Sequence, residues 1–542
     1  MLNTYNFADV WEAVVEVASD RPALVVGDRR LTYAELDTRA NRLANALAGV
    51  GVGPGDVVAC HLTNSTEYVE TLLAAWKVRA VPVNVNYRYT ADELAHLYRD
   101  SAAVAAVVDR GLVERVLAVA DQLDDLRTVL VVDDGSSATG GVSTDRIEVL
   151  EFDVVVSGSS DARPDVAGRG DDDRYIIYTG GTTGLPKGVE WRMGDAFFGC
   201  LGGGDPMRMS GPVAAPSELL DRVVDFDFTF YALAPMVHAA AQWVSFMWLF
   251  AGARVILHQG PFDAATVWRT IEEEGVSTTT VVGDAMARPL CDEWDRTGPY
   301  DTSSLFAFSN GGAPLSSSVR ERLQSILPGV VFTDGFGSSE TGIQGSSRLE
   351  PGARSAGTAR FDQVASGTVV LDDDLRPIEP GDERIGRVAH AGHLPIGYRN
   401  DPVKTAETFV EVDGRRYALN GDMAQVAEDG SVVLLGRGSI SINTGGEKVF
   451  PEEVEGVLKA HPAVYDCVVV GVPHERWGEQ VTVVVQPVDG ARVELDELVE
   501  HAREHLAGYK LPRELVTVEL IERSPTGKAD YRWARNVASG DD

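Results

Sequence analysis

The sequence predicts an α/β protein: a large N-terminal domain of several subdomains with βαβ sheets, followed by a small α+β C-terminal domain. A chain of 542 residues that is 44% hydrophobic is too long for one hydrophobic core. Helical periods alternate with short β-branched runs over residues 31–132 and again over residues 230–331. Near residue 436 this alternation gives way to short strands and helices, which indicates a second domain.

The elements follow in order along the chain. The helical stretch TYAELDTRANRLANALAGVGV alternates with the runs DVVAC, VPVNV and AVVDR, a pattern typical of a parallel sheet. Residues 157–173 are polar and rich in breakers, so we expect a surface connection leading into the strand DRYIIYTG, and residues 201–227 are a similarly irregular insertion. After the run SVVLLGR come the helix PEEVEGVLKAH, the strands VYDCVVVGV and QVTVVVQPV, and the helix ELDELVEHAREHLAGY. We therefore predict domains over residues 1–437 and 438–542.

The net charge limits the classes of molecule that the protein is expected to bind. The chain has 82 acidic and 48 basic residues and a formal charge of -34, which disfavours nucleic acid and anionic membrane surfaces. An anionic small substrate remains open if local glycine-rich loops and lysines supply a positive site. The four cysteines show no metal or CxxC spacing, and we expect buried thiols in a cytoplasmic protein without a membrane-spanning segment. The composition is also compatible with a homodimer.

One loop has the composition of a polyphosphate site. The string YTGGTTGLPKG, residues 178–188, follows an apolar strand and combines four glycines and three threonines with one lysine. Its backbone N–H groups, hydroxyls and ammonium suit phosphate oxygens, although a flexible glycine turn is the alternative. The spacing is not that of a Walker loop, and residues 335–340 do not form a dinucleotide fingerprint because Glu340 replaces the third glycine. The candidate phosphate contacts are Thr179, Gly180, Gly181, Thr182, Thr183, Gly184 and Lys187.

Further signals follow this loop in a fixed order. They are LTYAEL at 31–36, SNGGAP at 309–314, DGFGSSETG at 334–342, YALNGD at 417–422, GR at 436–437, NTGGEK at 443–448 and PTGK at 525–528. Together they resemble the adenylate-forming superfamily of acyl-CoA synthetases, peptide-synthetase adenylation domains and luciferases over nearly the whole chain. The resemblance implies that ATP activates a carboxylic acid as an acyl-adenylate and that a thiol, here coenzyme A, then displaces AMP. It also implies that the small domain is mobile.

The resemblance implies a role for each matching residue. Thr182, Thr183 and Lys187 would oppose the charge of the leaving pyrophosphate, while Glu340, with Thr182, would hold Mg²⁺. Lys528 would bridge the carboxylate and the α-phosphate. The remaining nucleotide contacts would be Gly311, Gly312, Ala313 and Pro314, then Asp334, Gly335, Phe336, Gly337 and Ser339, and finally Asp422 with Arg437 at the ribose.

The second half-reaction would use another face of the small domain. Gly445 and Gly446 would line the pantetheine channel after the domain rotates about a hinge at Ser439. The chain departs from many relatives at Ser439, where aspartate or lysine is common, and at Asn443, where several have an auxiliary lysine. Phe336 and Ser339 replace a common tyrosine and threonine. No departure removes a residue that the first step requires.

The acid substrate is inferred from residues 233–243, LAPMVHAAAQW. This run has no carboxylate to pair with an amino-acid ammonium, so an apolar acid is expected. His238 would gate the acyl channel or line the approach of the thiol; a packed or helix-capping histidine is the alternative. The strings EWR, PMVH, GDAMARPL and GGEKV more closely resemble bacterial fatty-acyl- and sterol-side-chain-CoA ligases.

Three other functions stay open at this point. The chain could be an acyl-AMP ligase that delivers to a carrier protein, a luciferase-like oxygenase, or a non-catalytic nucleotide- or CoA-binding protein. The joint presence of Lys187, Glu340, Asp422, Arg437 and Lys528 disfavours the last of these.

Overall fold

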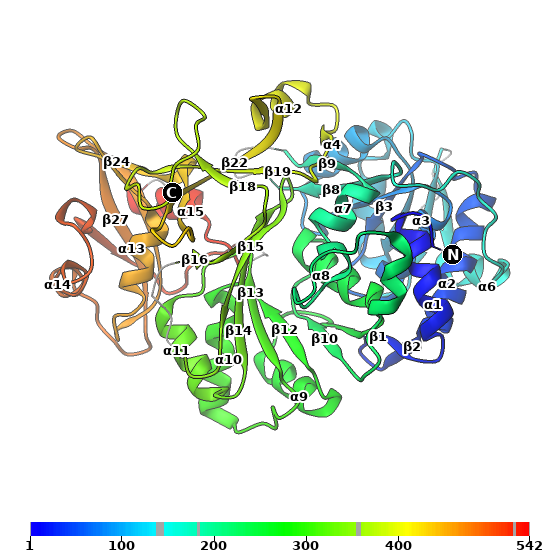
Figure 1. Cartoon of the computed structure of the whole chain (residues 1–542), viewed down its shortest axis with the longest axis horizontal. Coiled ribbons are helices and arrows are strands. Elements are labelled where there is room, and N and C mark those ends of the chain that lie inside the picture. The colour runs from blue at the N-terminus through cyan, green and yellow to red at the C-terminus, as the bar shows by residue number, and fades with distance from the viewer. Residues whose placement is uncertain (1, 137–145, 181–184, 354–358, 524–526, 541–542) are drawn as a thin grey trace.

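The computed structural model describes residues 2–136, 146–180, 185–353, 359–523 and 527–540. Figure 1 shows the two parts of the molecule, with the C-terminal part at one end of the long axis. The first parallel sheet has the order β4-β3-β5-β6-β7, and every neighbouring pair in it is parallel. Its strands are β3 (Val57–His61), β4 (Val81–Asn84), β5 (Ala103–Asp109), β6 (Thr128–Val132) and β7 (Glu148–Glu151).

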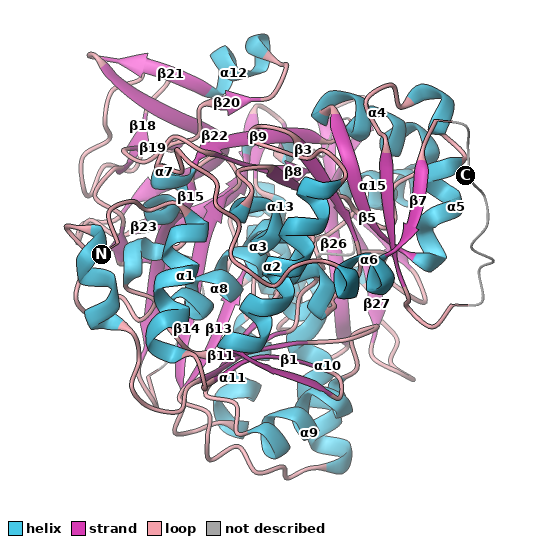
Figure 2. Ribbon diagram, turned by 90° about the vertical axis from the view of Figure 1, so that its right-hand side faces the viewer, coloured by secondary structure: helices cyan, strands magenta, loops and turns pink. Residues whose placement is uncertain are grey.

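Helices cover both faces of this sheet. The helices α4 and α5 lie on one side of it (Figure 2), and α2, α3 and α6 lie on the other. Apolar side chains of both groups of helices pack against the strands. The helices are α1 (Phe7–Ala18), α2 (Tyr33–Gly49), α3 (Thr66–Lys77), α4 (Ala91–Ser101), α5 (Val113–Leu117) and α6 (Phe152–Gly158). The βαβ alternation predicted for residues 31–132 is therefore present, because its β-branched runs are strands buried on both faces.

A nine-stranded sheet forms the second layer, in the order β17-β15-β14-β13-β12-β10-β11-β1-β2. The strands β10 to β14 and β1 pair in parallel, and antiparallel strands complete both edges. The strands are β1 (Pro22–Val26), β2 (Arg29–Thr32), β10 (Thr229–Ala232), β11 (Arg254–Leu257), β12 (Thr278–Val281), β13 (Ala307–Gly311), β14 (Val331–Ser338), β15 (Gly342–Leu349) and β17 (Gln363–Val364).

The two faces of this sheet have different neighbours. Phe308 and Phe332 point into a core formed with α9 (Ala264–Glu274), α10 (Asp284–Thr297) and α11 (Ser317–Ile326). The side chains of alternate residues, such as Ser309 and Thr333, therefore face the other way. On that side lie α7 (Met193–Gly199) and α8 (Ala239–Phe250), and the irregular residues 201–227 contain only short 3₁₀ turns, as predicted.

Two antiparallel sheets complete the N-terminal domain, and the larger of them leads into the C-terminal part. A three-stranded sheet has the order β20-β9-β8, and a six-stranded sheet has the order β16-β23-β22-β19-β18 with β21 beside β22. The strands are β8 (Arg174–Thr179), β9 (Lys187–Arg192), β16 (Arg360–Phe361), β18 (Thr368–Leu371), β19 (Gly386–Ala391), β20 (Gly397–Tyr398), β21 (Phe409–Val412), β22 (Arg415–Val426) and β23 (Val432–Arg437), with the helix α12 (Pro402–Thr408).

The C-terminal part has its own sheet, in the order β25-β24-β27-β26 with β28 beside β27. The core on one face packs against α13 (Pro451–Leu458) and α14 (Leu495–Arg503), and the core on the other packs against α15 (Tyr531–Ser539). The strands are β24 (Ile442–Thr444), β25 (Glu447–Val449), β26 (Val464–His474), β27 (Gly478–Pro487) and β28 (Glu514–Thr517).

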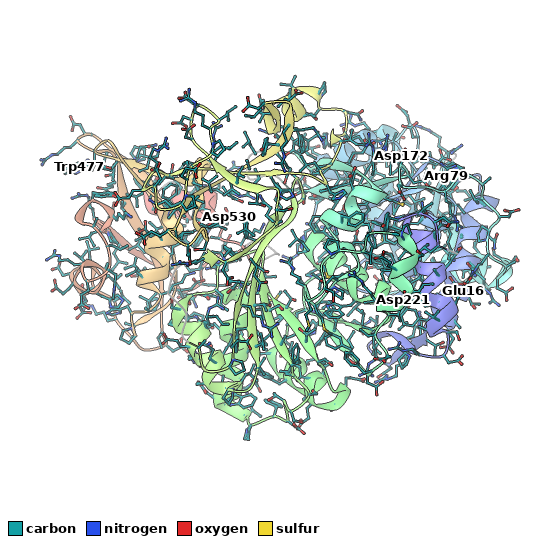
Figure 3. The ribbon with its side chains drawn as sticks, in the orientation of Figure 1. Glu16, Arg79, Asp172, Asp221, Trp477 and Asp530 are labelled. Atoms are coloured by element: carbon teal, nitrogen blue, oxygen red, sulfur yellow. The ribbon has the colours of Figure 1, made fainter. Side chains whose placement is uncertain are left out.

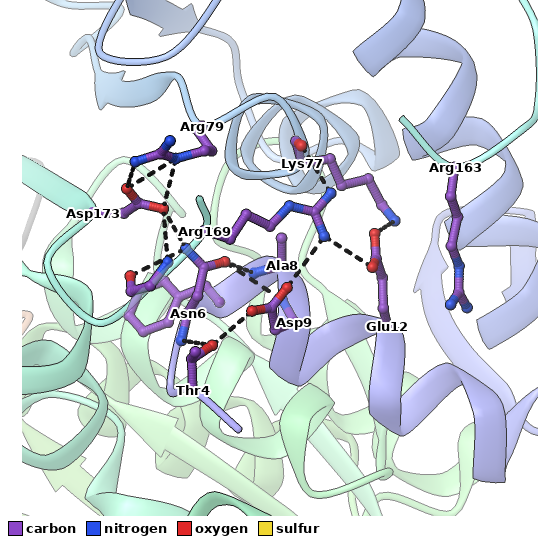
Figure 4. A network of polar contacts seen from close by, with 12 residues as sticks. Thr4, Asn6, Ala8, Asp9, Glu12, Lys77, Arg79, Arg163, Arg169 and Asp173 are labelled. Carbon is purple, nitrogen blue, oxygen red and sulfur yellow. Dashed lines mark hydrogen bonds and ion pairs between the residues drawn. The ribbon is translucent and has the colours of Figure 1, made fainter. Parts of the chain in front are cut away.

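The polar connection before β8 is tied to the N-terminal helix. Arg169 binds the carboxylates of Asp9 and Glu12 at 3.2 and 2.9 Å, and Glu12 also accepts from Lys77 at 2.8 Å (Figure 4). Asp173, at the end of the connection, pairs with Arg79 at 2.8 Å. This network fixes the start of β8, the strand that leads into the glycine-threonine loop.

Candidate active site between the two domains

The glycine-threonine loop joins two antiparallel strands. Thr179, the last residue of β8, pairs with Lys187, the first residue of β9, and Gly180 follows β8 directly. Gly181, Thr182, Thr183 and Gly184 lie outside the described residues. The Lys187 ammonium binds Asp401 Oδ2 at 2.7 Å and lies 5.7 Å from the centre of the Tyr398 ring. This pairing lowers the pKa of Asp401.

Glu340 lies in the turn between β14 and β15. Its Oε1 accepts a hydrogen bond from the Tyr398 hydroxyl at 2.8 Å. Burial raises the pKa of Tyr398, and the carboxylate of Glu340 raises it further, so this hydroxyl keeps its proton and donates to Glu340. The neighbouring Ser339 carbonyl accepts from Trp191 Nε1 at 3.1 Å. The same ring of Tyr398 thus links Glu340 to Lys187.

Glycines leave open space on the face of the large sheet opposite α10 and α11. A Cβ added to Gly311 would meet only the carbonyl of Gly335 at 3.7 Å, and one added to Gly335 would meet only a carbonyl at 4.0 Å. The two glycines are cross-strand partners, so the space is continuous across β13 and β14. Its floor is polar backbone without side chains, which suits the close approach of a flat heterocycle.

The other nucleotide candidates frame this floor. Gly312 has φ +81, and beyond it the backbone of Pro314 packs so closely on Gly283 that a Cβ there would come within 2.4 Å of the Pro314 carbonyl oxygen. The same added Cβ would lie 3.0 Å from Cβ of Ala313. A Cβ on Gly337 would lie 2.1 Å from a backbone oxygen across the β14–β15 turn, which explains the glycine. The close packing at Gly337 therefore fixes the turn that carries Glu340.

Two residues that were predicted to contact the nucleotide, Asp334 and Phe336, interact with other parts of the protein. Asp334 points toward α11, where its carboxylate binds Arg320 at 2.8 Å and accepts from Asn310 Nδ2 at 3.0 Å. Phe336 is 9% exposed, and its ring lies 4.5 Å from that of Phe361. The structure thus places the Asp334 side chain away from the open glycine floor, while Phe336 forms one edge of the core under β22.

Asp422 and Arg437 are cross-strand partners on β22 and β23. Arg437 Nε lies 3.5 Å from Asp422 Oδ1, and Asn420 Nδ2 donates to Asp422 Oδ2 at 2.7 Å. Burial raises the pKa of Asp422 above its ordinary value, although Arg437 and Lys528 favour its charged form. A carboxylate that is partly desolvated and held from one side keeps acceptor positions for further hydroxyl donors.

Lys528 comes to these residues from the other domain. A Cβ on the preceding Gly527, which has φ +74, would lie 3.0 Å from Cβ of Ala285 and 3.2 Å from a backbone oxygen of the β12–α10 turn. Although solvent reaches the lysine, the surrounding protein lowers its pKa, and Arg437 adds to this effect. Asp422, Glu340 and Glu452 act in the opposite sense. The ammonium therefore shares one electrostatic environment with Asp422 and Glu340.

His238 is the residue before α8 and is largely buried. Its Nε2 has no hydrogen-bond partner among the described residues. Burial lowers the pKa of His238 to about 4, and the charges of Lys528 and Arg88 contribute. The imidazole is therefore neutral near pH 7, and its unpaired ring nitrogen lies within the electrostatic reach of Lys528.

Gly445 and Gly446 do not reach this site. They form the turn of the hairpin between β24 and β25, with φ +61 and +91, and Gly445 N donates to the Trp477 carbonyl at 2.8 Å. Figure 3 shows Trp477 at the outer end of the C-terminal part, far from the large domain. This arrangement of the two parts therefore presents Lys528 to the site and leaves the glycine hairpin outside it.

Sequence reasoning missed three residues of the site: Tyr398, Asp401 and Glu452. The string NDP at 400–402 does signal a helix start, since Asp401 accepts from the Lys404 N–H at 2.9 Å and proline follows. Nothing in that signal links Asp401 to Lys187 or Tyr398 to Glu340. Glu452 is a surface position of an amphipathic helix by pattern, yet burial raises its pKa to about 7, with Glu455 and Asp422 adding to the rise.

Comparison with known proteins shows the family to which the chain belongs. The model of the AMP-binding enzyme family matches residues 11–395, and that of the AMP-binding enzyme C-terminal domain matches residues 453–528. A 3-oxocholest-4-en-26-oate–CoA ligase of Rhodococcus rhodochrous is 45% identical over 98% of this chain and 95% of its own length. A medium/long-chain-fatty-acid–CoA/3-oxocholest-4-en-26-oate–CoA ligase of Mycolicibacterium smegmatis is 43% identical over 98% and 96%.

Solved structures share the fold. An anthranilate CoA ligase in complex with anthranoyl-AMP superposes with a TM-score of 0.84 at 22% identity, covering 99% of this chain and 98% of its own. ATP-bound MatB from Rhodopseudomonas palustris gives 0.81 at 24% identity and 98% of each chain. The chain belongs to the family of AMP-binding enzymes. The predicted family, the fold class with its large and small domains, and the acid–thiol ligase class are thereby confirmed.

Proposed function

We propose that this protein is an ATP-dependent acyl-CoA ligase for a hydrophobic carboxylic acid, either a fatty acid or a steroid side-chain acid. It forms an acyl-adenylate with release of pyrophosphate and then the CoA thioester with release of AMP. The observation that carries the proposal is the convergence of Lys528 of the C-terminal domain with Asp422, Arg437 and Glu340 of the N-terminal domain. The names of the relatives at 43 and 45% identity support the same reaction.

In the first half-reaction a substrate carboxylate oxygen bonds to the α-phosphorus of ATP while the bond to pyrophosphate breaks. No proton is transferred, so the demand on the protein is to stabilise moving negative charge. The Lys528 ammonium is assigned to the carboxylate and α-phosphate, and Lys187 to the leaving pyrophosphate. Both lysines keep hydrogen-bond donors for these oxygens, since an ammonium has three.

The nucleoside is assigned to the glycine floor and the Asp422–Arg437 pair. The open face of Gly311 and Gly335 leaves room for adenine beside the Phe336 edge. Asp422 would accept from the ribose hydroxyls, because Arg437 and Asn420 hold its carboxylate in place. Asp334 would act indirectly, by holding Asn310 and Arg320 behind the floor.

Mg²⁺ fits the carboxylate of Glu340. Among the residues that the structure describes, no group of three or more histidine, cysteine, aspartate or glutamate side chains could hold a metal. An ion carried by ATP needs only one or two protein carboxylates, and Mg²⁺ usually keeps several waters. The ion would neutralise charge on the phosphates, and Tyr398 would orient Glu340 toward it. Thr182, assigned to the same ion, lies outside the described residues.

In the second half-reaction the thiol of coenzyme A loses its proton to solvent, the thiolate sulfur bonds to the acyl carbon, and the bond from that carbon to the phosphate oxygen of AMP breaks. The glycine hairpin of Gly445 and Gly446 is assigned to the pantetheine, and the neutral His238 to the acyl channel or the approach of the thiol. We place the domain boundary between residues 437 and 438 and the hinge at Ser439, within the 3₁₀ turn Gly438–Ile440 that separates β23 from β24. Rotation there would exchange Lys528 for the hairpin.

The substrate class is supported by the absence of a carboxylate in residues 233–243 and by the relatives' printed names. The proposal is tested by mass-spectrometric detection of the products formed from ATP, Mg²⁺ and a panel of fatty, aromatic and steroid side-chain acids, with and without coenzyme A. We expect acyl-CoA from one hydrophobic class. Acyl-AMP that accumulates with coenzyme A unused would replace the proposal by a carrier-protein ligase, and oxygen uptake with light would indicate a luciferase-like enzyme.

The proposal includes a cytoplasmic location, which the four buried, unpaired cysteines support. In the described part of the chain, the helices are all too short or too polar to cross a bilayer. A homodimer rests on composition alone, and light scattering of the purified protein would test it.

A further inference from the structure

The domain contact beneath Lys528 contains a buried ion pair that the reaction itself does not use. Lys459, at the end of α13, lies 3.7 Å from Asp284 Oδ2 at the start of α10, so the two residues come from different domains. Their side chains are 8% and 5% exposed. The hydroxyl of Ser318 also donates to the Lys459 carbonyl at 3.2 Å. Both the charge and the backbone of Lys459 therefore meet the N-terminal domain.

A second contact lies next to this pair. The Tyr465 hydroxyl donates to Asp292 Oδ2 at 3.1 Å, and the Arg288 guanidinium lies 5.2 Å from the centre of the Tyr465 ring. Arg288 and Asp292 belong to α10, about one and two turns beyond Asp284. One helix of the large domain thus offers a carboxylate to a lysine and another to a tyrosine of the small domain.

Each charge in the pair also has a partner within its own domain. Asp284 Oδ1 accepts from the Ser316 N–H at 2.8 Å, and Arg288 lies 4.0 Å from Asp284 Oδ2. Lys459 binds Asp466 Oδ1 at 3.3 Å. Burial opposes the charge of Lys459, but Asp466 and Asp284 outweigh it and raise its pKa. Separation of the domains would therefore break the pair without leaving either charge alone, which makes the contact reversible.

The pair is connected to Lys528 through the small domain. Asp466 binds Arg523 through two hydrogen bonds of 2.8 and 2.7 Å, and Arg523 Nη1 donates to the Gly527 carbonyl at 3.0 Å. Gly527 immediately precedes Lys528 and packs on Ala285, the residue after Asp284. The same turn of the large domain thus holds Lys528 through its backbone and holds Lys459 through a charge.

We propose that Asp284 and Lys459 are positioning residues for adenylation: their ion pair across the domain contact holds the small domain in the orientation that places Lys528 in the site. The proposal rests on the assignment of Lys528 to the first half-reaction. Its specific consequence is asymmetry, because a contact that exists only in this orientation favours adenylation and opposes the rotation that thioester formation requires.

The test measures the two half-reactions separately on the full-length enzyme. Adenylation is followed as pyrophosphate release from ATP and acid, and thioester formation as acyl-CoA made from supplied acyl-AMP. The variant D284N removes the charge and keeps an oxygen for Ser316, while K459M removes the ammonium and keeps the length of the side chain. We expect each to slow adenylation three- to tenfold and to leave thioester formation unchanged or faster. K459R, which keeps the charge, should recover most of the rate.

Three further variants complete the design. R254M removes a half-buried ion pair with Glu274 inside the N-terminal domain and serves as the matched control, with unchanged half-reactions expected. The double variant D284N/K459M should lose no more than the larger single effect, because both changes break one pair. Lys528→Ala tests the underlying assignment in the same assay.

The outcomes separate the two ideas. If Lys528→Ala loses adenylation selectively while D284N and K459M slow both half-reactions equally or neither, the positioning role is refuted and the proposed function stands. If Lys528→Ala itself shows no selectivity, the assignment of the first half-reaction fails. Thermal unfolding of each variant shows whether an equal loss of both activities reflects a loss of folded protein.

Discussion

Glu452 should make adenylation sensitive to pH. The residue lies on α13 of the small domain, yet a Cβ on Gly436 of the large domain would come within 2.9 Å of its Oε2. Burial, followed by Glu455 and Asp422, raises its pKa from the ordinary 4.5 to about 7. A raised pKa means that this arrangement of the domains loses stability as pH rises from 4.5 to 7, and that the cost of the charge is complete above pH 7.

The size of the effect follows from the pKa. At about 1.4 kcal/mol for each tenfold change in proton affinity, charging Glu452 costs roughly 3 kcal/mol. Glu455 accompanies it in any orientation of the small domain, whereas Asp422 and the contact with Gly436 exist only in this one. About half of the free-energy cost of charging Glu452, on the order of 1.5 kcal/mol, therefore opposes this orientation of the small domain above pH 7. That free energy corresponds to about a tenfold change in the equilibrium between this orientation and the separated one.

The variant Glu452→Gln removes the charge and preserves the shape. The ratio of its adenylation rate to that of the unmodified enzyme should be near one at pH 5.5 and should rise up to about tenfold at pH 8.5. Pyrophosphate release at saturating acid measures the rate, and Glu497→Gln, on the exposed side of α14, is the control. A ratio that does not change with pH, or a slower variant at pH 8.5, would refute the argument that this charge opposes closure.

Three other changes have directions that the site fixes. Lys528→Ala should lower adenylation by about 10²- to 10³-fold, as for the loss of one charge-stabilising donor, and should spare thioester formation from supplied acyl-AMP. Gly446→Leu should slow thioester formation and spare adenylation, since φ +91 strains a leucine and its side chain would fill the space beside the turn. Equal losses of both half-reactions in either variant would contradict the two-orientation scheme. Asp401→Asn keeps the side-chain cap of α12 but removes the ion pair with Lys187. The KM for ATP at low salt should therefore fall about two- to fivefold, as for an exposed ion pair. A rise in KM would show instead that Asp401 positions the lysine.

The sequence was sufficient for the parallel sheets and for the small domain. Their strands are continuous β-branched runs such as VPVNV and VYDCVVVGV, which are buried on both faces and therefore carry a strong local signal. The antiparallel sheet of β18, β19, β22 and β23 was not predicted. The strand β22 reads RRYALNGDMAQV, with only Ala418 and Ala424 fully buried, so its pairing depends on distant strands that no local pattern reveals.

The site likewise combines residues that short local motifs indicate with residues that only the fold brings together. Motif order singled out Glu340, Asp422, Arg437 and Lys528, because each stands in a short string that matches a motif of the family. It did not find Tyr398, which is 58 residues from Glu340 in sequence and 2.8 Å from it in space. Motif order also predicted a nucleotide contact for Asp334, and alternation along β14 places its side chain on the same face as the buried Phe332. That face packs against α11, and Arg320 there supplies the partner.

The net charge of -34 raises the question of how the site attracts ATP, and the ion pairs supply an answer. Lys187 is paired with Asp401 and Arg437 with Asp422, both at the surface of the site, with side chains 40% exposed for each cation. If Lys187 binds the phosphates as proposed, phosphate would replace the Asp401 carboxylate at an ammonium that is already oriented, so the cost of ordering that side chain has been met on folding. The acidic surface repels other polyanions at long range, and salt screens that repulsion beyond about 10 Å. In the proposed mechanism, selectivity for ATP would then depend on short-range exchange at Lys187 and on the contact of Lys528 with the bound nucleotide.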